Sequence, residues 1–220
     1  MKTEKVTKSK VAIIGLGNIG QAVATNLVKS NRPVIVATRD FAKAKNLSDK
    51  LGSLARAKDI AAAIKESDII VLTVWFNVIG ELLSKYNAEL QGKIIIDPSN
   101  PIAPDNKGGF VKIIGEKESA GLVHKSLLPK GAKLVKALGT LGAASLANAY
   151  RQKPESKVLF YANDNTSIND EIEELIRDCG FEPMHIGGID QSIRIEVFGD
   201  LHEFGALGKT VTQSEAKGKL

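Results

Sequence analysis

Short apolar runs recur along the chain, and each is followed by a segment whose apolar residues repeat at helical spacing. The runs are rich in Val and Ile and are continuous rather than alternating, which is typical of strands buried on both faces. They cover residues 11–15, 33–38, 68–74, 92–97, 132–138 and 156–162. This pattern predicts a parallel sheet that is covered by helices.

The segments between these runs predict the helices. They carry helix formers at helical spacing, and several begin with a capping residue such as Asn18, Asp40 or Asp59. The predicted helices cover residues 18–30, 40–51, 59–67, 78–86, 142–150 and 169–180. Strands and helices that alternate in this way predict a Rossmann-type α/β fold, a doubly wound and mostly parallel sheet with helices on both faces.

The end of the chain departs from this alternation. Residues 181–220 are rich in Gly and weakly periodic, and we expect one last strand over 182–186 and a helix over 191–198. No linker rich in Pro, Gly or Ser divides the chain, so we expect a single domain over residues 1–220. Its core would span about 9–180, and a small C-terminal extension, about 181–220, would lie over the cofactor cleft.

Three glycines, Gly15, Gly17 and Gly20, separate the first strand from the first helix. In a dinucleotide-binding turn the first glycine permits the bend, the second lets the pyrophosphate approach the backbone, and the third lets the helix pack against the strand. The unpaired N–H groups at the start of the helix then bind the phosphates. We expect a dinucleotide here, and a tight turn without a ligand is the alternative.

The end of the second strand indicates which dinucleotide binds. A free ribose hydroxyl is usually bound by Asp or Glu, whereas this strand ends in Thr38 and Arg39, with Lys43 one helical turn later. A hydroxyl, a guanidinium and an ammonium favour a 2′-phosphate, so we expect NADP rather than NAD. Asp40 is expected to cap the following helix. The alternative is that Asp40 binds the ribose and Arg39 stacks on the adenine.

Two further stretches lie at the carboxyl edge of the predicted sheet, where open α/β sheets bind ligands. Trp75 and Phe76 follow the third long strand and either form an apolar wall for the nicotinamide or pack in the core. Residues 97–105, DPSNPIAPD, contain three prolines and predict a stiff loop. Asn100 in that loop either binds the cofactor or forms an Asx turn with its own backbone.

Composition narrows the set of partners. Lys and Arg number 30 against 25 Asp and Glu and form no basic tract, so we expect no nucleic-acid partner. The single cysteine, Cys179, cannot form an internal disulfide, and no metal-ligand cluster is visible. The N-terminus, MKTEKVTKSK, is too polar for a signal peptide, and no apolar run has membrane-spanning length. We therefore expect a cytoplasmic protein without a metal or a membrane partner.

Several motifs together resemble one family. In chain order they are VAIIGLGNIGQAVA, ATRDFAK, LTVWFNVI, IIIDPSNPI, LLPKGAKLVKALGTL, CGFEPMHIGGI and QSIRIEVFG. They resemble the NADP-dependent oxidoreductases related to coenzyme F420-dependent NADP reductase, a group that includes the NADPH-binding domain of the STEAP metalloreductases. The resemblance covers nearly the whole chain. It implies hydride transfer between NADPH and a deazaflavin or flavin, and a homodimer, for which the apolar residues 204–207 suggest an interface.

The resemblance also implies roles for individual residues. It gives the 2′-phosphate to Thr38, Arg39 and Lys43, and the nicotinamide side to Val74, Trp75, Ser99, Asn100, Pro101 and Ala137. The pyrophosphate loop would comprise Gly15, Leu16, Gly17, Asn18, Ile19 and Gly20. The family usually reads Lys-Ala-Phe-Asn-Thr where this chain has KALGT, so Leu138 and Gly139 leave more room where a second ring would stack. Ser192, Arg194 and Glu196 match the cleft-closing element or form an ion-pair network.

Hydride transfer between two rings needs positioning rather than an acid–base set, and the sequence contains no such set. The three histidines, His124, His185 and His202, are scattered and are expected to be surface or packing residues. His202, which lies in the Gly-flanked segment GDLHEFGALG, is the one candidate proton donor. A redox sensor that binds NADPH without turnover is the alternative function.

Overall fold

The structure is a computed structural model, and it describes residues 8–220. Residues 1–7, which hold most of the polar N-terminus, lie outside the described part. Among residues 8–220 no helix is both long enough and apolar enough to cross a membrane.

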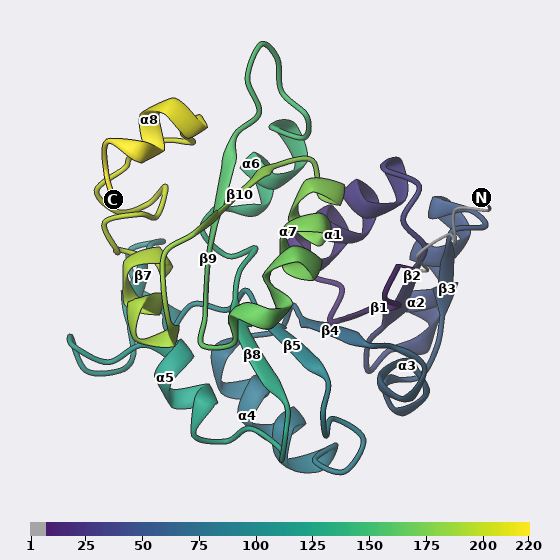
Figure 1. Ribbon diagram of the computed structural model, residues 1–220. Coiled ribbons are helices and arrows are strands. Elements are labelled where there is room, and N and C mark those ends of the chain that lie inside the picture. Colours follow the sequence, from purple (N-terminus) through teal and green to yellow (C-terminus); the bar gives the residue numbers. More distant parts are fainter. Residues whose placement is uncertain (1–7) are drawn as a thin grey trace.

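Within the described chain, eight strands form one sheet in the order β10-β9-β8-β5-β4-β1-β2-β3 (Figure 1). The strands from β8 to β3 are mutually parallel, β9 runs antiparallel to β8, and β10 runs parallel to β9. The bounds are β1 Val11–Ile14, β2 Val34–Ala37, β3 Ala55–Ala57, β4 Ile69–Leu72, β5 Ile94–Asp97, β8 Lys133–Lys136, β9 Val158–Asn163 and β10 Glu182–His185. The predicted mostly parallel Rossmann-type sheet is confirmed, and β3 is a short edge strand that the sequence pattern did not reveal.

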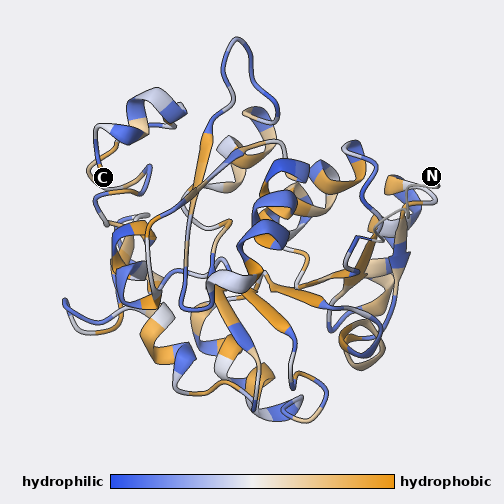
Figure 2. Cartoon of the chain, viewed as in Figure 1, coloured by the Kyte–Doolittle hydropathy of each residue, from blue (hydrophilic) through white to orange (hydrophobic). Residues whose placement is uncertain are grey.

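Helices cover both faces of the sheet because successive side chains of a strand point to opposite faces. Val11 and Ile13 belong to the core cluster that holds α1, α6 and α7, whereas Ala12 and Ile14 belong to the cluster that holds α3 and α4. Figure 2 accordingly shows the central strands as hydrophobic. The helices are α1 Asn18–Lys29, α2 Phe41–Leu51, α3 Ile60–Glu66, α4 Phe76–Lys85, α5 Ala120–Lys125, α6 Ala143–Asn148 and α7 Asn169–Asp178.

The C-terminal extension packs against β9 and β10. Its apolar residues, among them Ile195, Leu201 and Val211, share a third core cluster with those strands. The expected helix over 191–198 is wrong in type and length, because the chain forms a 3₁₀ helix, η2, over Ile189–Ile195. Phe198 has a φ of +74°, which no helix can contain. A short helix, α8 Gln213–Lys217, ends the extension.

The predicted stiff loop after β5 is only partly correct. Its second half forms strand β6, Ile102–Pro104, which pairs antiparallel with β7, Phe110–Lys112. Prolines are tolerated in this position because a two-stranded hairpin leaves edge N–H positions unpaired. The first half, Pro98 to Pro101, remains a loop at the carboxyl edge of the sheet.

Candidate functional site

The three glycines of the first turn meet three different steric demands. Gly15 has a φ of +98°, and a Cβ there would lie 2.5 Å from the Thr73 carbonyl oxygen. A Cβ on Gly20 would lie 2.1 Å from the Gly15 carbonyl oxygen. A Cβ on Gly17, in contrast, would meet nothing within 4 Å. The first and third glycines therefore pack the turn, and the second leaves open space in front of the helix.

The turn is also fixed by side chains that sequence inspection missed. Thr73, at the end of β4, donates from Oγ1 to the Gly15 carbonyl oxygen at 2.6 Å, and Gln21 donates from Nε2 to the Leu16 carbonyl oxygen at 3.0 Å. Helix α1 begins after Gly17 with no side-chain cap and no acidic residue in its first turn. Its first N–H groups are thus free to bind an anion.

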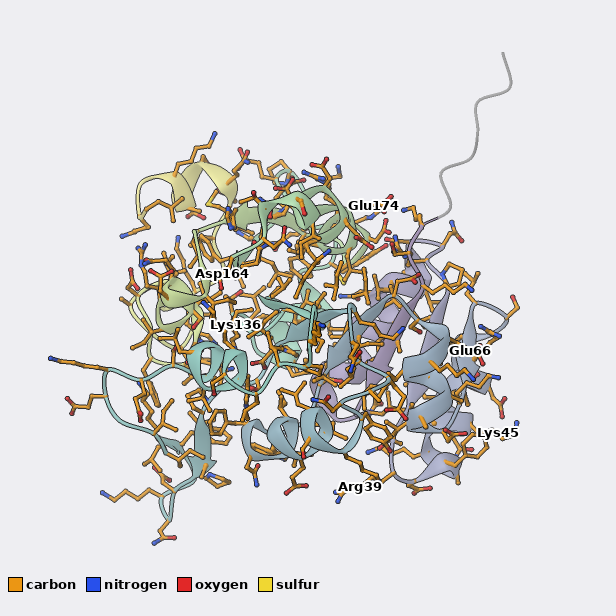
Figure 3. The ribbon with its side chains drawn as sticks, turned by 60° about the horizontal axis from the view of Figure 1, so that its bottom comes forward. Arg39, Lys45, Glu66, Lys136, Asp164 and Glu174 are labelled. Atoms are coloured by element: carbon orange, nitrogen blue, oxygen red, sulfur yellow. The ribbon has the colours of Figure 1, made fainter. Side chains whose placement is uncertain are left out.

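Two cations lie beside this turn without a protein partner. Arg39 and Lys43 are exposed, and no hydrogen bond or ion pair joins either side chain to another described residue. Lys43 and Leu16 line one shallow pocket, so the cation and the glycine turn face the same space. Figure 3 shows Arg39 at the rim of the molecule. Thr38 is half-buried at the tip of β2.

Asp40 acts as the cap of α2. Its Oδ1 accepts the N–H of Ala42 at 3.0 Å and that of Lys43 at 3.4 Å. These bonds satisfy two of the unpaired donors at the start of the helix. The expected capping role of Asp40 is confirmed, and its carboxylate forms no ion pair with Arg39 or Lys43.

At the end of β4, Trp75 is 55% exposed and caps α4 through its backbone, while Phe76 is half-buried. The Val74 side chain lies against the glycine turn, since a Cβ on Gly15 would come within 2.6 Å of Val74 Cγ1. Trp75 is thus accessible, whereas Phe76 is part of the packing. Helix α4 brings the indole to the edge where the glycine turn also lies.

In the loop after β5, the expected Asx turn at Asn100 is wrong, because the side chain bonds to distant backbone groups. Its Oδ1 accepts the Val197 N–H at 2.7 Å, and its Nδ2 donates to the Gly139 carbonyl oxygen at 3.3 Å. Asn100 thereby joins the loop to the C-terminal extension instead of closing an Asx turn. Ser99 is buried, and its hydroxyl has no partner among the described residues. Pro101 is also buried.

The backbone of the KALGT segment, residues 136–140, is specific to the residues of this chain. Leu138 is fully buried with a φ of +65°, and a Cβ on Gly139 would lie 2.2 Å from the Pro98 carbonyl oxygen. An asparagine at position 139 would not fit this backbone. Ala137 is buried as well.

Four charged residues are buried together close to this segment, and we call Asp97, His124, Lys136 and Glu196 the buried quartet. At most 3% of each residue is exposed. Asp97 Oδ2 lies 2.8 Å from His124 Nδ1 and 3.2 Å from Lys136 Nζ. Lys136 Nζ lies 3.8 Å from Glu196 Oε1 and donates to the Ser99 carbonyl oxygen at 2.6 Å. Sequence inspection did not find the quartet, although Asp97 and Lys136 each end an apolar strand.

Asp97 is ionised in this environment. Burial alone would raise its pKa, but the ammonium of Lys136 and the ring of His124 hold the pKa of the Asp97 carboxyl well below its usual range. The Ser99 N–H contributes a further hydrogen bond to Asp97 Oδ1 at 2.7 Å.

His202 does not fit the expected role of proton donor. Its Nε2 lies 2.9 Å from the Gly139 carbonyl oxygen, and its Nδ1 accepts the Phe204 N–H at 2.9 Å. Burial lowers the pKa of His202 to about 4, so the ring is neutral near pH 7. Both ring nitrogens are occupied by backbone groups, and His202 fastens the extension to the loop after β8.

Arg194 and Glu196 each form an ion pair, but they do not share one network with Ser192, whose hydroxyl has no partner among the described residues. Arg194 pairs with Asp200 at 2.8 Å. Glu196 accepts the N–H groups of Ala120 and Gly121 at the start of α5, each at 3.0 Å. Ser192 is fully buried. These contacts hold the extension against the body of the protein.

The residues present fit a dinucleotide phosphate. The space in front of Gly17, the uncapped start of α1 and the free cations Arg39 and Lys43 complement its anionic groups, and the unpaired Ser99 hydroxyl lies at the other end of the same sheet edge. Among residues 8–220 no group of three or more His, Cys, Asp or Glu side chains is placed to hold a metal ion. The arrangement can bind and position, but it offers no exposed acid–base pair.

Comparison with known proteins agrees with this geometry. The model of the family described as "NADP oxidoreductase coenzyme F420-dependent" matches residues 10–101. Metalloreductase STEAP3 of Rattus norvegicus is 26% identical over 187 residues, which cover 85% of this chain and 36% of that protein. The chain thus spans about a third of that relative. The F420-dependent NADP reductase of Methanothermobacter marburgensis is 25% identical over 198 residues, with 85% and 88% of the two chains covered.

A solved structure supports the fold along nearly the whole chain. A hypothetical protein from Sinorhizobium meliloti superposes with a TM-score of 0.80 at 27% identity, covering 93% of this chain and 96% of that one. The resemblance expected from the sequence motifs is therefore confirmed, and the chain is related to NADP-dependent oxidoreductases.

Proposed function

We propose that this relative of the F420-dependent NADP oxidoreductases is an enzyme that transfers a hydride between NADPH and a planar acceptor of the flavin or deazaflavin type. One observation carries most of the proposal. An open glycine turn lies beside two cations, Arg39 and Lys43, that no described residue neutralises. Free charges of this kind are favourable where a ligand supplies the opposite charge.

The phosphate end would bind as follows. The N–H groups at the start of α1 would hold the pyrophosphate in the space that Gly17 leaves open. The planar guanidinium of Arg39 and the ammonium of Lys43 would bind the 2′-phosphate, with the Thr38 hydroxyl as a further donor. Asp40 would not oppose this phosphate strongly, because its carboxylate already caps α2.

At the other end, the chain would position the nicotinamide over the carboxyl ends of β4, β5 and β8. Bound NADPH would supply the hydride. Trp75 would offer an accessible flat wall, and the buried Ser99 hydroxyl is a free hydrogen-bonding group. The extension, fastened through Asn100 and His202, would help to exclude water. No side chain needs to move a proton during the hydride step.

The proposal is tested by following NADPH oxidation by absorbance in the absence of oxygen, with riboflavin, FMN or coenzyme F420 as the acceptor. We expect a rate that is proportional to protein, saturates with at least one acceptor and is lower with NADH. Reactions without protein provide the control. Stoichiometric NADPH binding without oxidation by any of the three acceptors would overturn the enzyme proposal and favour the redox-sensor alternative.

A further inference from the structure

The buried quartet contacts each segment that carries the nicotinamide side of the site. Trp75 directly precedes Phe76, whose carbonyl oxygen lies 3.1 Å from His124 Nε2. Ser99 donates its backbone N–H to Asp97 at 2.7 Å. A displacement of the quartet would therefore move these segments, although each of its members is buried.

The quartet is also continuous with the segment after β8 and with the C-terminal extension. Ala137 follows Lys136, and Val197, which binds Asn100, follows Glu196. Glu196 accepts backbone N–H groups of α5, the helix that also carries His124. The quartet is thus the one place, within the described chain, where the ends of β5 and β8, the start of α4, helix α5 and the extension are joined by charged side chains.

The hydrogen-bond partners of His124 indicate which of its ring nitrogens carry a proton. A carbonyl oxygen can only accept a hydrogen bond, so Nε2, which faces the Phe76 carbonyl, must carry a proton. Nδ1 faces Asp97 Oδ2 at 2.8 Å, and an ionised carboxylate also only accepts. Both contacts are satisfied together only if both ring nitrogens donate, as they do in an imidazolium.

Charge balance leads to the same conclusion. With an imidazolium at His124, two positive charges offset the two carboxylates, Asp97 and Glu196, and the quartet is neutral. With a neutral ring the quartet would carry one uncompensated negative charge in a site that is at most 3% exposed. Burying an unpaired charge costs several kcal/mol, on the order of 3–5 when one partner of a buried pair is removed.

We propose that His124 is a positioning residue that stays doubly protonated and, through the neutral buried quartet, sets the loops that hold the nicotinamide end of NADPH. The proposal rests on the proposed function for the identity of the ligand. His124 does not contact the dinucleotide. It acts through Asp97 on the Ser99 loop and through the Phe76 carbonyl on the start of α4, which bears Trp75.

The protonation state is tested on the unaltered protein by nitrogen NMR of its histidine side chains. The groups that face the His124 ring are Asp97, with Lys136 and Glu196 behind it, and the Phe76 carbonyl. We expect both ring nitrogens of His124 to carry protons at pH 7, because both face hydrogen-bond acceptors. A neutral ring at pH 7 would overturn the proposal. This experiment requires neither a ligand nor turnover.

The positioning role is tested with His124→Gln and two ligands, NADPH and 2′,5′-ADP, which has the 2′-phosphate but no nicotinamide. We expect His124→Gln to weaken NADPH binding about tenfold, the effect of one charge-assisted hydrogen bond, and to leave 2′,5′-ADP binding unchanged. The matched control is His185→Gln, in which the histidine of β10 stacks on Tyr161. Equal losses for both ligands would show a general structural defect and overturn the positioning role.

A double variant tests the charge balance. His124→Gln combined with Asp97→Asn removes one charge of each sign and leaves Lys136 and Glu196 as a neutral pair. We expect the double variant to bind NADPH more tightly than His124→Gln alone. An affinity no better than that of the single variant would overturn the charge-balance argument. Failure of every form to bind NADPH would contradict the proposed function instead, and the NMR result would still decide the state of His124.

Discussion

The charged side chains at the two ends of the proposed dinucleotide site differ in exposure and in pairing. At the phosphate end, Arg39 and Lys43 are exposed and have no described partner. Near the proposed nicotinamide end, Lys136 is 3% exposed and contacts two carboxylates and a carbonyl oxygen. Arg39 and Lys43 are therefore available to a ligand, whereas Lys136 is paired within the protein.

This difference suggests two roles: the exposed cations would recognise the phosphate, and the buried charges would position the loops. An exposed charge contributes little to folding, since surface ion pairs are worth about 0–1 kcal/mol, so its removal should be felt mainly by the ligand. A buried and paired charge is costly to disturb, because its former partners stay buried without compensation. Substitutions at the two ends should therefore have separable effects on stability and affinity.

The largest effect is expected from Lys136→Met. The substitution leaves Asp97 and Glu196 opposed by one positive charge and removes the donor to the Ser99 carbonyl oxygen. We expect the free energy of unfolding, measured with urea, to fall by about 3–5 kcal/mol. Lys133→Met on the same strand is the control and should change it by less than about 1 kcal/mol. A similar small loss for Lys136→Met would remove the distinction between the two ends.

The pH dependence of stability tests the fastening of the extension. Burial lowers the pKa of His202 to about 4, below the value near 6.5 of an exposed histidine, so the unfolded chain binds more protons between these values. Stability from this residue is therefore complete above about pH 6.5 and decreases by up to about 3 kcal/mol as the pH falls toward 4. His202→Gln should reduce the slope of unfolding free energy against pH in this range. An unchanged slope would contradict a neutral buried His202.

Replacing both Arg39 and Lys43 by Ala should change affinity without changing stability. Each charge-assisted contact with a phosphate is worth about 1.5–3 kcal/mol, less when exposed, so we expect NADPH binding to weaken about a hundredfold. NADH binding and the melting temperature should stay the same. The control replaces Arg56 and Lys45, which form surface pairs with Glu66 and Asp49. Equal loss of NADH and NADPH affinity would show that the two cations do not read the 2′-phosphate.

The smallest effect is expected from Asp40→Ala. Loss of the two capping bonds should lower the free energy of unfolding by about 1 kcal/mol. The preference for NADPH over NADH should be unchanged or slightly greater, because a carboxylate near the phosphate is removed. A large gain in NADPH affinity relative to NADH would instead show that Asp40 contributes to ribose recognition.

The local sequence predicted structure correctly where the interacting residues are also close along the chain. The strands, most of the helices and the glycine turn could be predicted, because their signals are short-range patterns of burial and backbone freedom. The 3₁₀ helix η2 and the hairpin of β6 and β7 were missed because their conformations depend on packing and pairing rather than on periodicity. Asn100 was placed at the right edge, but its partner Val197 lies 97 residues away.

The sequence alone determined a glycine turn and a cationic strand tip, since residues 15–20 and 38–43 each form a local unit. Only the tertiary structure decided which charged side chains stay exposed and which form pairs inside the protein. Asp97, His124, Lys136 and Glu196 come from four separate segments, and their meeting depends on strand order and on the path of the extension. The physical reason is that charge pairing in a buried site depends on distance in space, which no spacing along the chain encodes.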